Sequence, residues 1–238
     1  MKKIKLPSLQ HVARQWAPTP EKVAKNLERL ALASPPFSYE PLYHLVRGML
    51  VLDDPLAQVC HAVQARKLHP HAKRNYLELL PMVSEHFSAV RPEYILEVAP
   101  RFYPVGKDLF VPFKPPLLYG KGGDEFLPWF VFWKVNPVAG ENLSLFVTLV
   151  VEMMAQDPDL ERAKFTIVDF SADDAKSPRK IELIDARAIA RVPEARKIEM
   201  LDILVKGHHM AQANLRNREL PNESTKLPPD DRQPDLPF

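Results

Sequence analysis

The chain has 238 residues, of which 46% are hydrophobic, so it is long enough to bury a substantial core. Its 32 basic and 30 acidic residues nearly cancel, which excludes a protein that attracts nucleic acid through its overall charge. The single cysteine, Cys60, excludes a disulfide framework and favours a reducing compartment. We find no apolar signal segment at the N-terminus and no bilayer-length apolar run. We therefore expect a cytoplasmic protein with no membrane partner.

The first 90 residues are predicted to be helical after a short arm at residues 1–18. Within the helical region, 19–90, apolar residues recur at helical spacing in four segments, which start near residues 19, 39, 56 and 70. Pro81 predicts a kink in the fourth helix. The short connections indicate antiparallel packing of neighbouring helices.

The spacing of apolar residues changes after residue 90 and predicts an α+β region over 91–216, which is expected to form one compact domain with 19–90. The expected fold is a helical N-terminal layer followed by a mixed sheet of about five strands with two packed helices. Everything from residue 217 to 238 is polar and proline-rich, and we expect a disordered tail. The predicted strands are 94–105, 108–119, 125–135, 164–170 and 179–189, and the predicted helices are 141–156 and 193–215.

The segment 125–135 is expected to lie at the centre of the sheet. Its sequence, EFLPWFVFWKV, is apolar on both alternating faces, so the strand must be covered on both sides. Trp129, Phe130 and Trp133 are its predicted core residues. The helix at 141–156 is apolar nearly all round, which indicates burial in the core or in a subunit contact.

The order of elements from residue 70 to 170 is helix, three strands, helix, strand. This order resembles the core of the PD-(D/E)XK nuclease superfamily. The resemblance implies an acid near the start of the second strand and an acid-x-Lys on the third, which together bind a divalent metal. Asp108 supplies the first acid and Lys134 supplies the lysine, so these two residues are the catalytic candidates.

The second acid of that motif is missing, because Phe132 occupies its position. Glu97 and Glu125 are the acids that would have to replace it. A single carboxylate with a lysine makes a poor magnesium site, so the sequence favours a catalytically degenerate relative over an active nuclease.

No cofactor or metal is expected. The chain has no glycine-rich phosphate loop of the dinucleotide-binding or nucleotide-triphosphatase type. The histidines lack cysteine or carboxylate partners at ligand spacing, so we expect them to be solvated at the surface. The histidines considered are His61, His69, His71, His208 and His209.

A local basic patch is predicted at the junction of the third and fourth helices. Its members could lie along a phosphate backbone, with DNA as the possible partner, although such charge runs are more often a solvated face. Lys2, Lys3, Lys5 and Arg14 are candidates to extend it. The residues of the patch itself are Arg66, Lys67, Lys73 and Arg74, flanked by His69 and His71.

The last six residues, Gln-Pro-Asp-Leu-Pro-Phe, resemble the peptide motif that binds the bacterial sliding clamp. The resemblance implies that Gln233 enters a polar pocket, that Leu236 and Phe238 anchor in an apolar cleft, and that Asp235 belongs to the bound peptide. Pro234 departs from the motif, where leucine is commoner.

These features predict a non-enzymatic accessory protein of DNA replication, repair or plasmid and mobile-element maintenance, tethered to the bacterial sliding clamp. One alternative is a metal-dependent or catalytically degenerate nuclease. A second alternative is an interaction protein with no nucleic-acid role, which dimerises through the helix at 141–156.

Overall fold

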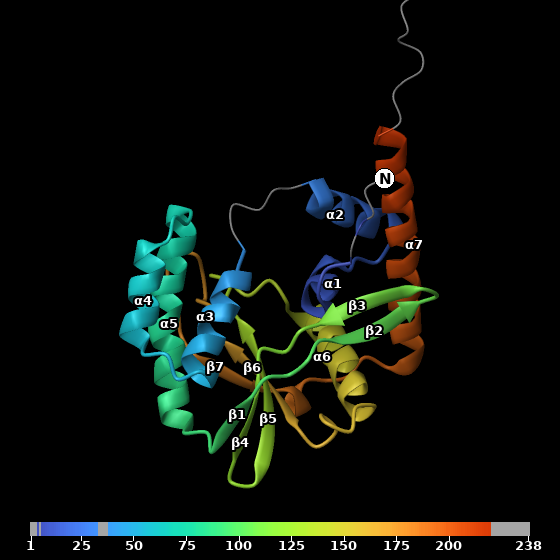
Figure 1. Cartoon of the computed structure of the whole chain (residues 1–238). Helices are drawn as coiled ribbons and strands as arrows, with labels where there is room; N and C mark the ends of the chain where they lie inside the picture. Colours follow the sequence, from blue (N-terminus) through green and yellow to red (C-terminus); the bar gives the residue numbers. More distant parts are fainter. Residues whose placement is uncertain (1–3, 5, 33–37, 220–238) are drawn as a thin grey trace, which may run out of the picture.

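The computed structural model describes residues 4, 6–32 and 38–219 and is an α+β fold (Figure 1). Its elements in chain order are α1 (Leu9–Gln15), α2 (Pro20–Leu32), α3 (Glu40–Val51), α4 (Leu56–Ala65), α5 (Pro70–Val90), β1 (Tyr94–Leu96), β2 (Arg101–Gly106), β3 (Leu109–Phe113), β4 (Leu118–Lys121), β5 (Asp124–Val131), α6 (Gly140–Ala155), β6 (Lys164–Asp169), β7 (Glu182–Asp185), a short 3₁₀ helix (Ala186–Ala188) and α7 (Glu194–Glu219).

Five of the strands form a mixed sheet in the order β1-β4-β5-β6-β7. β5 and β6 are parallel and are joined through α6, whereas β4 and β7 run antiparallel to their neighbours. The predicted mixed sheet of about five strands is therefore confirmed.

The strands β2 and β3 form a separate two-stranded sheet. The sequence predicted single strands over 94–105 and 108–119, and this prediction is wrong because each divides in two. Pro100 lies between β1 and β2, and Pro115 and Pro116 lie between β3 and β4. Proline has no N–H to give to a ladder, so it ends the pairing at these points.

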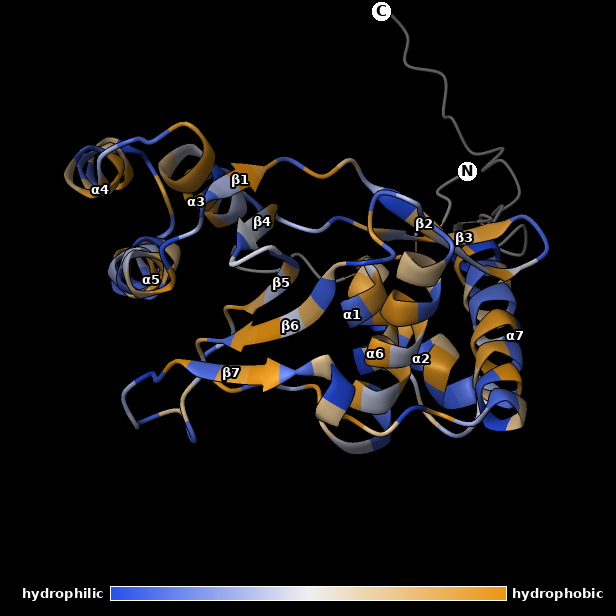
Figure 2. Cartoon of the chain, turned by 90° about the horizontal axis from the view of Figure 1, so that it is seen from below, coloured by the Kyte–Doolittle hydropathy of each residue, from blue (hydrophilic) through white to orange (hydrophobic). Residues whose placement is uncertain are grey.

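Strand β5 is covered on both faces, as its sequence predicted. Leu127, Trp129 and Val131 join the apolar cluster that contains α1, α2, α6 and α7. Phe130 and Phe132 join the cluster that contains α3, α4 and α5. Figure 2 shows the two groups of helices on opposite sides of the strands. The alternation of side chains along one strand thus distributes the helices between two layers.

The predicted single N-terminal helical layer divides between these two sides. α2 packs along α7, and α1 packs on α6, whereas α3, α4 and α5 cover the other face of the sheet. α5 continues through Pro81 as one helix of 21 residues. The division follows from the sheet, because both of its faces are apolar and both require cover.

The long helix α7 lies against α2 at very close range. A side chain at Gly207 would bring its Cβ within 2.6 Å of Val23 in α2, so only glycine fits at this crossing. The Trp16 indole N–H donates to the Met200 carbonyl at 3.1 Å, which fixes α1 to the same helix. α7 extends to Glu219, past the predicted start of the tail, and residues 220–238 lie outside the described part of the chain.

None of the helices in the described residues combines the length and the apolar character that a membrane crossing requires.

Replacing Phe130 with alanine is expected to lower the free energy of unfolding by about 3–5 kcal/mol, because the substitution removes a buried aromatic ring. The Phe130 side chain is 1% exposed and contacts Phe87, Phe132 and Phe170. Phe102 is 61% exposed, so Phe102→Ala is the matched control and should change stability little. Denaturant unfolding measures both, and equal stability of the two variants would contradict the central position of β5.

Candidate functional site

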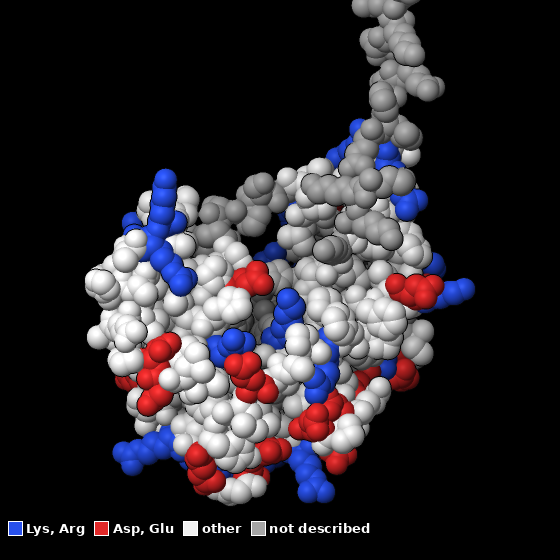
Figure 3. All heavy atoms as spheres, in the orientation of Figure 1, with Lys and Arg blue, Asp and Glu red and all other residues white. Residues whose placement is uncertain are grey.

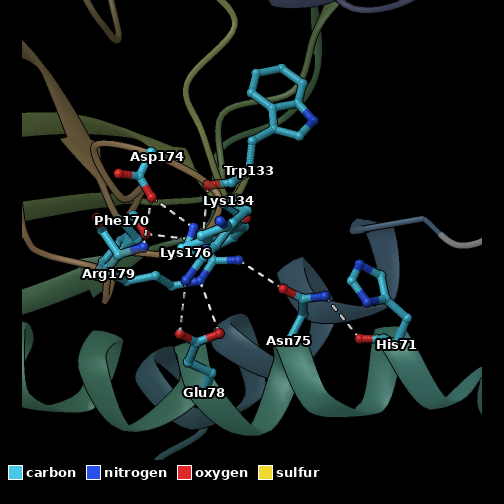
Figure 4. Close-up of polar contacts among 11 residues, drawn as sticks. His71, Asn75, Glu78, Trp133, Lys134, Phe170, Asp174, Lys176 and Arg179 are labelled. Atoms are coloured by element: carbon cyan, nitrogen blue, oxygen red, sulfur yellow. Dashed lines mark hydrogen bonds and ion pairs between the residues drawn. The ribbon is translucent and has the colours of Figure 1, made fainter.

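The carboxyl ends of the parallel strands β5 and β6 are the natural place for a site, because ligands of open α/β sheets bind at this edge. Phe132, Trp133 and Lys134 follow β5, and Phe170 follows β6. Figure 4 shows polar side chains from α5 and from the loop after β6 converging on these residues.

Arg179 lies at the centre of this cluster, and its side chain is buried, with only 1% of it exposed. Its Nη1 donates to the carbonyls of Phe132 at 3.1 Å, Trp133 at 2.9 Å and Phe170 at 3.0 Å. Its Nη2 donates to the Asn75 side chain at 2.8 Å. The guanidinium therefore satisfies carbonyl groups that the sheet ladder leaves open where the strands end.

Arg179 lies near one acidic and one basic side chain, Glu78 and Lys134. Its Nε lies 3.2 Å from Glu78 Oε2, and Lys134 Nζ lies 3.7 Å from Glu78 Oε1. The Glu78 carboxylate is thus shared between two cations. Hydrogen bonds from the backbone N–H groups of Ser177 and Lys176 lower the pKa of Asp174, and nearby Lys134 adds to this effect. Glu78 and Asp174 are therefore committed to cations or to backbone donors.

Tyr43 fills the space beside β5 that β4 leaves uncovered. β4 pairs only with the first part of β5, and the Tyr43 hydroxyl donates to the Phe130 carbonyl at 2.8 Å. The Tyr43 ring lies 5.0 Å from that of Phe132. Burial raises the pKa of Tyr43, with a smaller contribution from Tyr39. An aromatic side chain, and not a carboxylate, occupies this edge of the strand.

The structure does not bring Asp108 and Lys134 together. Asp108 lies in the turn between β2 and β3, on the separate two-stranded sheet, whereas Lys134 follows β5 in the main sheet. The predicted strand 108–119 divides at Pro115 and Pro116, and only its second part, β4, pairs with β5, so Asp108 lies away from Lys134.

The remaining positions of the nuclease resemblance do not complete an acidic site either. Phe132, which stands in place of the second acid, is buried with 3% exposed. The two acids that would have to replace it have other partners: Glu97 pairs with Arg47 at 3.2 Å, and Glu125 accepts a hydrogen bond from Tyr94 at 2.9 Å. Within the described residues, no three histidine, cysteine or acidic side chains gather as a metal site would require.

The histidine prediction is partly wrong. His61 and His209 are exposed, and His69 caps α5 by accepting from the His71 backbone N–H at 3.2 Å. His208, by contrast, is 8% exposed, and its Nε2 lies 3.2 Å from the Ile4 carbonyl. It is buried because α7 packs its apolar side against the N-terminal segment.

On the other side of Lys134, Trp133 contacts two residues of α1. The Arg14 guanidinium lies 5.3 Å from the Trp133 ring centre, and the centre of the His11 ring lies 5.4 Å from that of Trp133 in a T-shaped contact. Burial, helped by Arg14, lowers the pKa of His11 to about 4, so its imidazole is neutral at neutral pH. Trp133 therefore ties α1 to the end of β5.

The predicted DNA-contacting residues do lie together, at the junction between α4 and α5. Arg66, Lys67 and Arg74 are exposed, and the Lys73 ammonium donates to the Gln64 carbonyl at 2.8 Å. None of the four has a carboxylate within ion-pair distance among the described residues. Figure 3 shows Lys and Arg atoms gathered at this end of the two helices. We call these four residues the α4–α5 patch.

The clamp-binding candidates Gln233, Asp235, Leu236 and Phe238 lie outside the described residues, as do Lys2, Lys3 and Lys5. The sequence analysis missed Asn75, Tyr43 and Arg179. Tyr43 and Asn75 stand on helices with no local signal that would separate them from ordinary helix residues.

No protein-family model matches this chain, and no curated protein is significantly similar to it.

Replacing Arg179 with methionine is expected to lower the free energy of unfolding by about 3–5 kcal/mol, because it leaves three buried carbonyls without their donor and removes one of the two cations that pair with Glu78. Thermal and denaturant unfolding measure the change. Arg162, whose side chain is 89% exposed, gives the matched control Arg162→Met. If Arg179→Met unfolds at the same denaturant concentration as the wild-type protein, Arg179 does not hold the strand ends.

Proposed function

We propose that this protein is a non-enzymatic, DNA-binding accessory protein of replication, repair or plasmid and mobile-element maintenance, tethered to the bacterial sliding clamp. The observation that carries the DNA-binding part is the α4–α5 patch. Its four cationic side chains lie at one end of the molecule without carboxylate partners among the described residues.

Proteins bind DNA phosphates best through lysine and arginine side chains that are not already paired with a carboxylate. A lysine or arginine that already pairs with a carboxylate gains little from a phosphate, whereas an unpaired one releases counterions from DNA when it binds. The net charge of the chain is only +2, so its overall charge supplies no general attraction for DNA. Attraction must therefore come from a local concentration of positive charge such as the α4–α5 patch.

The order of elements supports a relation to the nuclease core without nuclease chemistry. α5, β1, β4, β5, α6 and β6 follow one another as helix, three strands, helix and strand, with the β2–β3 hairpin inserted between the first two strands. Before β4 the chain has Pro115, Pro116 and Leu117, and two residues before Lys134 it has Phe132. Apolar residues therefore stand where the resemblance implies carboxylates, which favours binding over catalysis.

The double variant Lys67→Gln/Arg74→Gln is expected to bind duplex DNA more weakly and with less dependence on salt. Each lost phosphate contact reduces the slope of log affinity against log salt by about 1, so the slope should fall by about 2. Fluorescence anisotropy with a labelled duplex over a series of salt concentrations measures both quantities.

The matched control for this test is Lys121→Gln. Lys121 is the exposed last residue of β4, and the β4–β5 hairpin lies at the opposite end of the molecule from the α4–α5 junction (Figure 1). The control removes one positive charge without touching the patch. Equal effects of Lys121→Gln and the patch variant, or no DNA binding by the wild-type protein, would refute the proposed DNA contact.

The proposed binding of the C-terminal peptide to the sliding clamp is supported by the sequence alone. Gln233, Leu236 and Phe238 have the spacing of a glutamine-led clamp peptide, in which a polar pocket and an apolar cleft take these side chains. Pro234 and Pro237 restrict the peptide backbone and reduce the entropy cost of binding it in an extended form.

The intact chain is expected to bind purified bacterial sliding clamp with a dissociation constant of about 1 μM, as is reasonable for a short peptide. Leu236→Ala/Phe238→Ala should abolish binding, since it removes both anchors, whereas Leu227→Ala lies outside the motif and should bind normally. Isothermal titration calorimetry measures all three. Binding that survives the double substitution, or no binding by the intact chain, would remove the clamp from the proposal.

A further inference from the structure

A second region of unpaired positive charge lies on α2. The side chains of α2 and the end of α7 enclose an open recess of about 270 Å³. Its lining consists of Lys25, Asn26, Glu28, Arg29, Leu32 and Arg218. We call this the α2 recess. Three of its six lining residues are cationic and one is acidic.

The single carboxylate of the recess is already neutralised. Glu28 is 8% exposed, its Oε1 accepts from Asn214 at 2.6 Å, and its Oε2 lies 3.1 Å from Arg218. Lys25 and Arg29 have no carboxylate within ion-pair distance in the described residues. Their charges are therefore available to an anion from outside.

Arg14 of α1 is not one of the lining residues, but it interacts electrostatically with Arg29. Burial, and to a lesser extent the positive charge of Arg29, lowers the pKa of Arg14. The Gln15 amide, with its oxygen turned toward Arg14, accepts from Nε at 3.2 Å and from Nη2 at 3.0 Å.

We propose that the α2 recess binds a phosphate group of the DNA backbone through Lys25 and Arg29. A phosphodiester fits this chemistry because the Arg29 guanidinium can bind two of its oxygens at once and the Lys25 ammonium supplies a second positive charge. The inference rests on the proposed function, since DNA is taken from it as the source of the phosphate. Figure 3 shows Lys and Arg atoms at both the end of α7 and the α4–α5 junction, on the same end of the molecule.

The test compares Lys25→Gln/Arg29→Gln with the wild-type protein, the α4–α5 patch variant and Lys121→Gln, using a labelled DNA duplex. Both substituted residues are exposed, so the variant is expected to fold normally, and its melting curve checks this. The affinity for DNA should fall by about 10-fold or more, with a salt slope smaller by about 2. Because the two basic regions share no contacts, combining the recess and patch variants should multiply their separate effects.

Unchanged affinity of the recess variant, beside weakened binding by the patch variant, would overturn the recess and leave the proposed function intact. No DNA binding by the wild-type protein would overturn the proposed function instead. In that case, calorimetry with inorganic phosphate decides the recess. Phosphate binding that Lys25→Gln/Arg29→Gln abolishes would keep it as a site for a free phosphate, and equal or absent binding by both proteins would remove it.

Discussion

Strand β5 has large apolar side chains on both faces, and this constraint determines where the helices lie. Leu127 and Trp129 require cover from α1 and α6 on one side, and Phe130 and Phe132 require cover from α3 and α5 on the other. The strand therefore occupies the third position of five, where neighbouring strands protect both edges for part of its length. Burial of these aromatic side chains is also a large favourable contribution to folding.

The ends of the strands impose a second requirement, because their buried backbone carbonyls need hydrogen-bond donors. Where the parallel pair β5 and β6 ends, backbone carbonyls point into the protein without ladder partners, and unpaired buried carbonyls are costly. The Arg179 guanidinium satisfies three of them and is itself balanced by Glu78. Tyr43 satisfies another beside β5. The edge at which open α/β sheets commonly hold ligands is here occupied by the protein's own side chains, and the unpaired positive charge lies on the surrounding helices instead.

The sequence was sufficient for the fold class and for the central strand, because a strand that is apolar on both faces is stable only where both faces are covered. It predicted the order of helices and strands, but it merged β1 with β2 and β3 with β4. The error arose because the β-forming residues on either side of Pro100 and Pro115 look like continuous strands. Because strand 108–119 divides, Asp108 belongs to the separate β2–β3 hairpin and does not join Lys134 in one site.

The polar network at the strand ends was not predictable. Arg179 follows the polar turn SADDAKSP, a composition typical of a solvent-exposed loop, yet its side chain is buried against Asn75, 104 residues earlier in the chain. Such long-range pairs leave no periodic pattern. The α4–α5 patch was predictable, because its residues are neighbours in the sequence, whereas the α2 recess depends on the packing of α2 against α7.

The central proposal is that this protein binds DNA through its basic surface residues without a catalytic metal. The most direct measurement is to incubate the full chain with supercoiled plasmid, with and without Mg²⁺ or Mn²⁺, and to follow binding and cleavage in the same samples. We expect the plasmid to be bound without the metal ions, to be bound more weakly with them because they compete for the phosphates, and to remain intact in both cases. Cleavage that requires the metal and is lost in Lys134→Ala would contradict this account.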